Sequence, residues 1–217
     1  MLSIVSTPIW NLEDITLRAL RTLREADIIA CEDTRTSWVL LHHYEISKPL
    51  ISFHAHSWDV KVEKIITLLQ EWKHVALISD AGTPGISDPA YILVKRAIEE
   101  QITIVPIPGA SAVLSALVGS WMHMHDFRFL GFLPVKKGRE TMFKSLINKD
   151  YTVVVYESVH RILRTLSDME KYLGADHQIV VARELTKKFE EFKHGTIQEC
   201  RTHFEQNICK GEFVIIF

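Results

Sequence analysis

The fold class is indicated most directly by the stretch SDAGTPGISDPA at residues 79–90. It follows a short apolar run over residues 75–78 that is typical of a buried strand. Gly82 and Gly85 let the backbone turn sharply and let a ligand approach where a Cβ would obstruct it. A polar loop at the carboxyl end of a buried strand is where open α/β sheets bind ligands, although the same pattern also suits a plain connecting turn.

The two aspartates of this stretch have different interpretations. Asp88 precedes Pro89, and a capping side chain followed by proline is typical of a helix start, so we predict Asp88 to be a cap. Asp80 stands at the strand end, where no local cap requires it. We therefore predict that Asp80 accepts hydrogen bonds from a bound ligand.

Outward from this stretch, strand and helix patterns alternate through the first half of the chain. The expected strands cover residues 3–6, 27–31, 49–53, 75–78 and 102–105. The expected helices cover residues 11–24, 37–44, 60–72, 88–100 and 110–118, the first with Asn11 as its cap. This alternation predicts an α/β fold with a parallel five-stranded, Rossmann-like sheet covered by helices on both faces.

The second half repeats the alternation with different spacing. We expect strands over residues 127–132, 152–156, 178–182 and 212–217, a helix over 159–173 ended by Gly174, and a turn at Gly195. Residues 119–126 are interpreted as the junction. The sequence thus predicts two α/β domains, residues 1–119 and 120–217, the second with a smaller mixed sheet.

Composition narrows the functional classes. The chain has 217 residues, 47% apolar, and a formal net charge of -2, so the whole molecule is not a basic nucleic-acid binder and any RNA site must be a local patch. Three scattered cysteines favour a reducing compartment, and no apolar run approaches a membrane span, so we expect a cytoplasmic protein without membrane contact. The histidine pairs lack a third ligand at usual spacing, so we expect no metal site.

Charged residues gather after two expected strands of the second half. Glu157, Ser158, His160 and Arg161 follow the strand over 152–156, where a helix cap is the plain alternative to a site. Residues 183–188, Arg-Glu-Leu-Thr-Lys-Lys, form a second cluster, which a solvated charge run would also explain.

Two basic patches are compatible with RNA phosphate contacts and equally with a solvated face. The first contains Lys136, Lys137, Arg139 and Lys144, and the second contains Arg18, Arg21 and Arg24.

Taken together, these stretches resemble the class III methyltransferases of the tetrapyrrole methylase superfamily, in the branch that acts on ribosomal RNA. The matching stretches run in order over nearly the whole chain: Thr7-Pro8-Ile9 with residues 11–16, residues 31–35, residues 79–84, Pro108-Gly109 with Ser111-Ala112, residues 131–134, Tyr156-Glu157-Ser158 with His160-Arg161, residues 182–187, and residues 210–213.

The resemblance implies a homodimer of chains with two α/β domains and S-adenosyl-L-methionine in the cleft between them. It implies methyl transfer to the ribose 2′-hydroxyl of a cytidine in the decoding region of 16S ribosomal RNA in the small ribosomal subunit. The cofactor-binding residues that follow from it are Pro8, Asp80, Ala81, Gly82, Thr83, Pro84, Ser111, Ala112, Tyr156 and Leu185. Candidates for catalysis are Glu157, Arg161 and His54, because the ribose hydroxyl must lose its proton.

Departures from the family pattern keep alternatives open. The family usually has glycine where this chain has Trp10 and proline where it has Val159. We expect Trp10 either to narrow the cofactor site or to stack outward against RNA. The other functions considered are methylation of a small tetrapyrrole-like substrate and a non-catalytic family member that binds cofactor or RNA.

Overall fold

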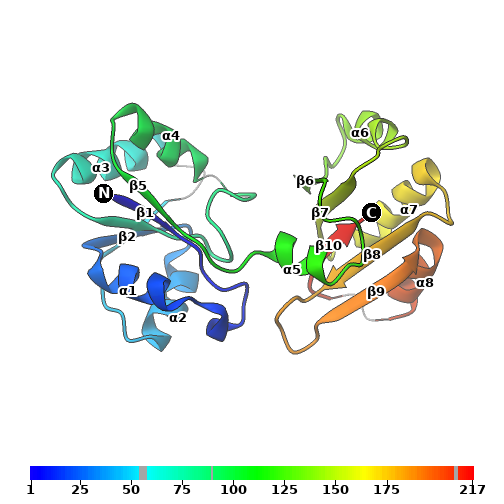
Figure 1. Cartoon of the computed structure of the whole chain (residues 1–217), viewed down its shortest axis with the longest axis horizontal. Coiled ribbons are helices and arrows are strands. Elements are labelled where there is room, and N and C mark those ends of the chain that lie inside the picture. Colours follow the sequence, from blue (N-terminus) through cyan, green and yellow to red (C-terminus); the bar gives the residue numbers. More distant parts are fainter. Residues whose placement is uncertain (54–57, 89, 208–209) are drawn as a thin grey trace. The chain divides into compact units, whose positions relative to one another are not determined.

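A computed structural model describes residues 1–53, 58–88, 90–207 and 210–217, and it divides the chain into two compact units, Met1–Ser111 and Ala112–Phe217 (Figure 1). This division falls before helix α5 (Ala112–Val118), which we expected at the end of the first domain. The reason is that α5 contacts strand β10 (Glu212–Ile216) of the second unit. The domain boundaries and the position of the cofactor between the domains stay predictions.

The first unit contains the predicted parallel sheet, in the order β3-β2-β4-β1-β5. Its strands are β1 (Leu2–Val5), β2 (Ile28–Cys31), β3 (Leu50–Ser52), β4 (Val75–Leu77) and β5 (Ile104–Ile107). Helices α1 (Leu17–Glu25) and α2 (Thr34–His43) cover one face, and α3 (Trp58–Gln70) and α4 (Tyr91–Glu99) cover the other (Figure 1). A separate apolar core lies on each face, which confirms the doubly covered α/β architecture.

Two helix starts in this unit differ from expectation. Asn11 caps only a short 3-10 helix, η1 (Leu12–Asp14), and Thr16 caps α1 by accepting the Ala19 N–H at 3.0 Å. The prediction that Asp88 caps a helix is wrong, because α4 begins at Tyr91 without a side-chain cap. The Asp88 carboxylate instead accepts the backbone N–H groups of Gly85 and Ala90, each at 2.8 Å, and so closes the loop on itself.

The second unit is built on a mixed sheet in the order β6-β7-β10-β8-β9. Its strands are β6 (Phe127–Phe132), β7 (Thr152–Ser158), β8 (Gln178–Arg183), β9 (Glu191–Thr196) and β10. The pair β6 and β7 is parallel, and every other neighbouring pair is antiparallel. The edge strand β6 carries a register shift between Phe129 and Gly131.

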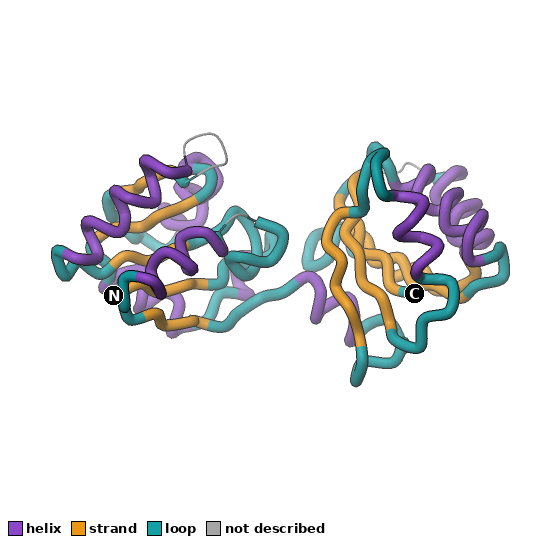
Figure 2. The backbone as a smooth tube through the Cα atoms, turned by 90° about the horizontal axis from the view of Figure 1, so that it is seen from above, coloured by secondary structure: helices purple, strands orange, loops and turns teal. Residues whose placement is uncertain are grey.

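Helices α6 (Arg139–Ser145), α7 (Ile162–Leu173) and α8 (Ile197–Gln206) share one apolar core with this sheet, whose strands Figure 2 shows beside the packed helices. We expected this sheet to be smaller than the first, but both sheets contain five strands.

Two local predictions in the second unit are corrected. Gly195 does not form a turn but lies inside β9, where a Cβ would come within 2.5 Å of the Glu199 carboxylate. The missing side chain leaves room for Glu199, which forms a capping box with Thr196 at the start of α8. Helix α7 begins at Ile162 rather than at Val159, because β7 continues through Ser158.

Candidate functional site

In the first unit, the loops after β1, β4 and β5 meet at the carboxyl edge of the sheet. Thr7 donates its N–H to the Gly82 carbonyl at 2.8 Å, and Gly82 donates its N–H to the Pro8 carbonyl at 3.4 Å. The Thr83 hydroxyl lies 3.0 Å from the Ser6 hydroxyl and donates to the Ala110 carbonyl at 3.3 Å. The structure therefore brings together the predicted residues Pro8, Gly82 and Thr83 and ties all three loops to one another.

Glycine is required at two of these contacts. Gly82 has a φ of +77°, and a Cβ there would lie 3.3 Å from the Ile9 side chain. At Gly109 a Cβ would lie only 2.8 Å from the Ser6 Cβ. By contrast, Gly85 also has a positive φ, +91°, but its missing side chain faces open space. The loops are thus packed closely at their base and open near Gly85.

Carboxylates collect beside these loops. Asp80 accepts the Asp33 N–H at 3.0 Å, and burial, reinforced by the negative charge of Asp33, raises the pKa of Asp80. Burial also raises the pKa of Glu32, and the charges of Asp80 and Asp88 add to this. A cavity of ≈ 10 Å³, room for about one water molecule, is lined partly by Glu32 and Asp88. Mutually repelling carboxylates create a negative potential that a cationic ligand relieves.

Trp10 has a left-handed backbone conformation, with a φ of 91°, and 50% of the residue's surface is exposed. A bulky residue with positive φ is a genuine outlier that costs on the order of 1–3 kcal/mol. The resemblance expects glycine at this position, and the observed backbone explains that preference, since glycine adopts such a φ without strain. Trp10 therefore occupies a backbone position shaped for glycine.

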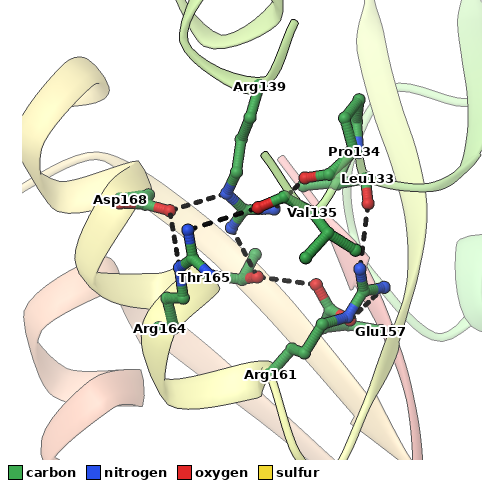
Figure 3. Close-up of polar contacts among 9 residues, drawn as sticks. All are labelled: Leu133, Pro134, Val135, Arg139, Glu157, Arg161, Arg164, Thr165 and Asp168. Carbon is green, nitrogen blue, oxygen red and sulfur yellow. Dashed lines mark hydrogen bonds and ion pairs between the residues drawn. The ribbon is translucent and has the colours of Figure 1, made fainter. Parts of the chain in front are cut away.

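In the second unit, the predicted residue Glu157 is engaged on both carboxylate oxygens (Figure 3). Its side chain is 0% exposed. Oε1 accepts the Ser158 N–H at 2.8 Å and pairs with the Arg161 guanidinium at 2.7 Å, and Oε2 accepts the Thr165 hydroxyl at 2.6 Å. A carboxylate held this way is suited to fixing its neighbours in place.

The contacts continue from Thr165 to Arg139, which is buried (Figure 3). Arg139 donates to the Thr165 hydroxyl at 2.8 Å and pairs with Asp168 at 2.7 Å. We call the set Arg139, Glu157, Arg161, Thr165 and Asp168 the arginine–carboxylate network. Arg161 stands at the start of α7, and Thr165 and Asp168 follow it at intervals of four and three residues, so these three lie on one helix face. Arg139 reaches them from α6.

Tyr156 and Leu185, two predicted cofactor residues of this unit, are also partly or fully buried. Burial raises the pKa of Tyr156 to about 12, and the Val113 backbone in α5 opposes this rise. The rings of Phe129 and Phe132 meet the Tyr156 ring edge-on, with centroids 4.8 and 5.7 Å away.

The remaining predicted positions are accounted for as follows. Ala81 is exposed, Pro84 is buried, and the half-buried Ser111 and Ala112 stand at the end of one unit and the start of the next. His54 lies outside the described residues. The cluster over residues 183–188, for which a solvated charge run was the alternative, contains ion pairs: the Lys187 ammonium contacts Glu184 at 2.7 Å and Glu212 at 3.1 Å.

Sequence reasoning did not find Thr165 or Ser6, whereas Gly109 stood in one of the stretches quoted for the resemblance. Thr165 carried one available signal, its spacing of four residues from Arg161 on an amphipathic helix. Over the described ranges, no group of three or more histidine, cysteine, aspartate or glutamate side chains is arranged to hold a metal ion. None of the helices in the described part of the chain has the length and apolarity needed to cross a bilayer.

Comparisons with known proteins agree with this architecture. The sequence model of the tetrapyrrole (corrin/porphyrin) methylases matches residues 1–201. A protein of Synechocystis sp. named ribosomal RNA small subunit methyltransferase I is 44% identical over 217 residues, covering 100% of this chain and 78% of its own length. One of the same name from Thermotoga maritima is 46% identical over 215 residues, covering 99% of this chain and 96% of its own.

Solved structures share the fold at lower identity. A diphthine synthase superimposes with a TM-score of 0.77 at 15% identity, covering 99% of this chain and 88% of its own. A cobalt precorrin-4 methyltransferase gives a TM-score of 0.75 at 15% identity, covering 99% of this chain and 93% of its own.

Proposed function

Because the chain belongs to the tetrapyrrole (corrin/porphyrin) methylase family, we propose that it uses S-adenosyl-L-methionine to methylate the ribose 2′-hydroxyl of a cytidine in the decoding region of small-subunit ribosomal RNA. The observation that carries this proposal is the full-length similarity to proteins named as small-subunit ribosomal RNA methyltransferases. The solved structures support only the fold, because their sequence identity to this chain is low.

The residues of the first unit fit a cationic cofactor. S-adenosyl-L-methionine supplies an electrophilic methyl group on a positively charged sulfonium. The carboxylates of Asp80, Glu32 and Asp88 provide the negative potential that such a cation favours. Gly85 leaves open space where a side chain would stand, and the Ser6–Thr83 and Thr7–Gly82 contacts hold the loop at one geometry.

The chain's own contribution to rate is proposed to be mainly positioning. Methyl transfer is an in-line displacement, so holding donor and acceptor in line supplies much of the acceleration. Loops tied to one another by their own contacts need little further ordering when a ligand binds. Glu157 and Arg161 are assigned as positioning residues rather than as the group that removes the ribose proton, because both Glu157 oxygens already hold partners.

The proposal is tested with purified protein, labelled S-adenosyl-L-methionine and small ribosomal subunits from a strain that lacks the corresponding gene. We expect label in the RNA and a new 2′-O-methyl cytidine in mapped ribose methylation. The matched substrate is a decoding-region RNA fragment with 2′-deoxycytidine at the mapped position. Transfer that persists on the deoxy fragment would contradict ribose methylation, and cofactor binding without transfer to any RNA would support a non-catalytic member or a small-molecule methylase instead.

The homodimer and the cytoplasmic location follow from the resemblance and the composition and stay predictions. Sedimentation of the full chain tests the first, since a species of only 25.0 kDa at micromolar concentration would contradict a dimer.

A further inference from the structure

The loop between β6 and α6 is fixed by three arginines that bind consecutive backbone carbonyls (Figure 3). Arg161 donates to the Leu133 carbonyl at 3.0 Å, Arg139 donates to the Pro134 carbonyl at 3.0 Å, and Arg164 donates to the Val135 carbonyl at 3.2 Å. Since Arg139 and Arg161 belong to the arginine–carboxylate network, the loop is anchored to the buried Glu157 and to Thr165. Three guanidinium anchors are more than a short connection requires.

The anchored loop carries positive charge that no acidic residue of the described ranges pairs with. Lys136 and Lys137 follow the third anchored carbonyl, and both are exposed. Neither forms an ion pair with any residue of the described ranges within 4.0 Å, whereas Lys144, in the same predicted basic patch, pairs with Glu140 at 2.8 Å. The predicted patch therefore reduces to two lysines on a fixed loop, because Arg139 is buried and Lys144 is paired.

The same loop begins beside predicted site residues. Strands β6 and β7 are parallel, and Phe132 is in register with Tyr156, so residues 133–137 leave the sheet at the edge where Glu157 follows. Phe132 is 54% exposed, and its ring lies 5.9 Å from the Arg161 guanidinium. An exposed aromatic face beside cations is the combination on which unpaired bases stack while their phosphates bind the cations.

We propose that the loop over residues 133–137, with Phe132 at its start, is a docking surface for single-stranded ribosomal RNA. This inference rests on the proposed function, since it takes the RNA substrate as its occupant. Lys136 and Lys137 bind phosphates, Phe132 stacks on a base, and the arginine–carboxylate network keeps the loop in one conformation. A phosphate ligand supplies the negative partners that the two lysines lack.

The test measures binding of a fluorescent decoding-region RNA to the full chain and to the double variant Lys136→Ala/Lys137→Ala over a range of salt concentrations. We expect the variant to bind about tenfold more weakly near physiological salt and to lose about 2 from the slope of log affinity against log salt, because two phosphate contacts are removed. Phe132→Ala should weaken binding with an unchanged salt slope. The midpoint of thermal unfolding and the binding of S-adenosyl-L-methionine should not change in the lysine variant.

The matched control is Lys64→Ala/Lys73→Ala, which removes the same charge from two exposed lysines of the first unit. Equal weakening in both variants, or none in the loop variant, would overturn the docking surface while RNA methylation by the unaltered chain still stood. Loss of binding to intact subunits with full binding to free RNA would assign the loop to a ribosomal protein and overturn the RNA assignment. An unaltered chain that neither binds nor methylates RNA would refute the proposed function itself.

Discussion

At the carboxyl ends of the strands, the two units of this chain hold their neighbouring segments together with different kinds of contact. At the edge of the first unit, loops are joined by backbone groups and hydroxyls, as in the Thr7–Gly82 and Ser6–Thr83 contacts. At the corresponding edge of the second unit, the arginine–carboxylate network makes the joins, with Glu157 and Thr165 fully buried. In the first unit the contacts are between neutral groups, and burial raises the pKa values of the nearby carboxylates of Glu32 and Asp80, which have no cation to pair with them in these contacts. In the second unit the contacts are ionic, and Glu157 and Arg161 pair with each other.

This difference distinguishes residues that are available to contact a ligand from residues whose contacts stabilise the fold. Charged groups near a candidate site are readily assigned a function. A buried carboxylate whose oxygens all have partners, however, cannot bind a substrate without losing those partners. In the second unit the groups left over for a ligand are the lysines beyond the network. In the first unit they are the carboxylates themselves.

The largest effect is expected from Glu157→Ala, which breaks the ionic join. The free energy of unfolding should fall by about 3 kcal/mol, because removal leaves the Arg161 charge and the Thr165 hydroxyl without their buried partner. Denaturant unfolding measures the change.

The control for this variant is Glu140→Ala, which removes an exposed carboxylate paired with Lys144 and should leave stability unchanged within error. If Glu157→Ala does not accumulate, Thr165→Val removes only the bridging hydroxyl and should cost about 2 kcal/mol, while Thr165→Ser keeps it. A fully stable Glu157→Ala that loses only methyl transfer would instead place Glu157 in the chemistry.

A smaller effect is expected from Gly82→Ala, which strains the neutral join. We expect a loss of about 2 kcal/mol in unfolding free energy, because the positive φ and the nearby Ile9 side chain both oppose a Cβ. Gly85→Ala is the matched variant, since it meets the same backbone strain in open space and should cost about 1 kcal/mol. Equal losses would show that close packing at Gly82 contributes nothing.

Trp10→Gly should stabilise the first unit, by about 1 kcal/mol, because glycine adopts the observed backbone without strain. If Trp10 narrows the cofactor site, calorimetry should also give tighter binding of S-adenosyl-L-methionine in the glycine variant. Equal cofactor affinity with weaker RNA binding would instead support a tryptophan that stacks outward. Trp10→Ala separates the two contributions, since it removes the ring but keeps the backbone strain.

The smallest stability effect is expected from Asp80→Asn, which keeps an acceptor for the Asp33 N–H and removes one charge. Since the folded pKa of Asp80 is raised, the folded state binds its proton more tightly than the unfolded state does. The stability that Asp80 provides is therefore present below about pH 4 and is lost as the pH rises through the raised pKa.

At pH 7 Asp80→Asn should raise the unfolding free energy by no more than about 0.5 kcal/mol, while weakening the binding of a cationic cofactor. Denaturant unfolding at pH 4 and pH 7 with calorimetry at pH 7 gives both quantities. Unchanged cofactor affinity would remove Asp80 from the cofactor site.

The sequence was sufficient for the regular parts of the fold. The alternation of apolar strands with amphipathic helices specified the parallel sheet, because parallel strands need a helix to return the chain. It was insufficient where one side chain competes for two roles. Asp88 looked like a helix cap but closes its own loop, and Gly195 looked like a turn but makes room for Glu199. Local pattern cannot reveal a contact partner that folding brings from elsewhere.

The candidate site was predicted to a similar degree. The stretch around Asp80 and Gly82 was predicted to bind a ligand because glycines and an acid follow a buried strand, although the same pattern also suits a connecting turn, and its role stays a prediction. The occupation of Glu157 could not be foreseen, since Thr165 reaches it only after α7 packs on β7. Nor could the sequence show that Arg139 would be buried, which left Lys136 and Lys137 as the exposed part of the patch.

The register shift between Phe129 and Gly131 bears on how the protein behaves when concentrated. Strand β6 is the edge of its sheet, and an edge with a free row of amides and carbonyls is a template for addition of a strand from another molecule. The shift twists the edge and breaks that row near its middle, and Pro134 follows directly after Leu133 with no amide to offer. Self-association through this edge into amyloid-like stacks is thereby opposed by the backbone itself, even though Leu130 and Phe132 expose apolar side chains along it.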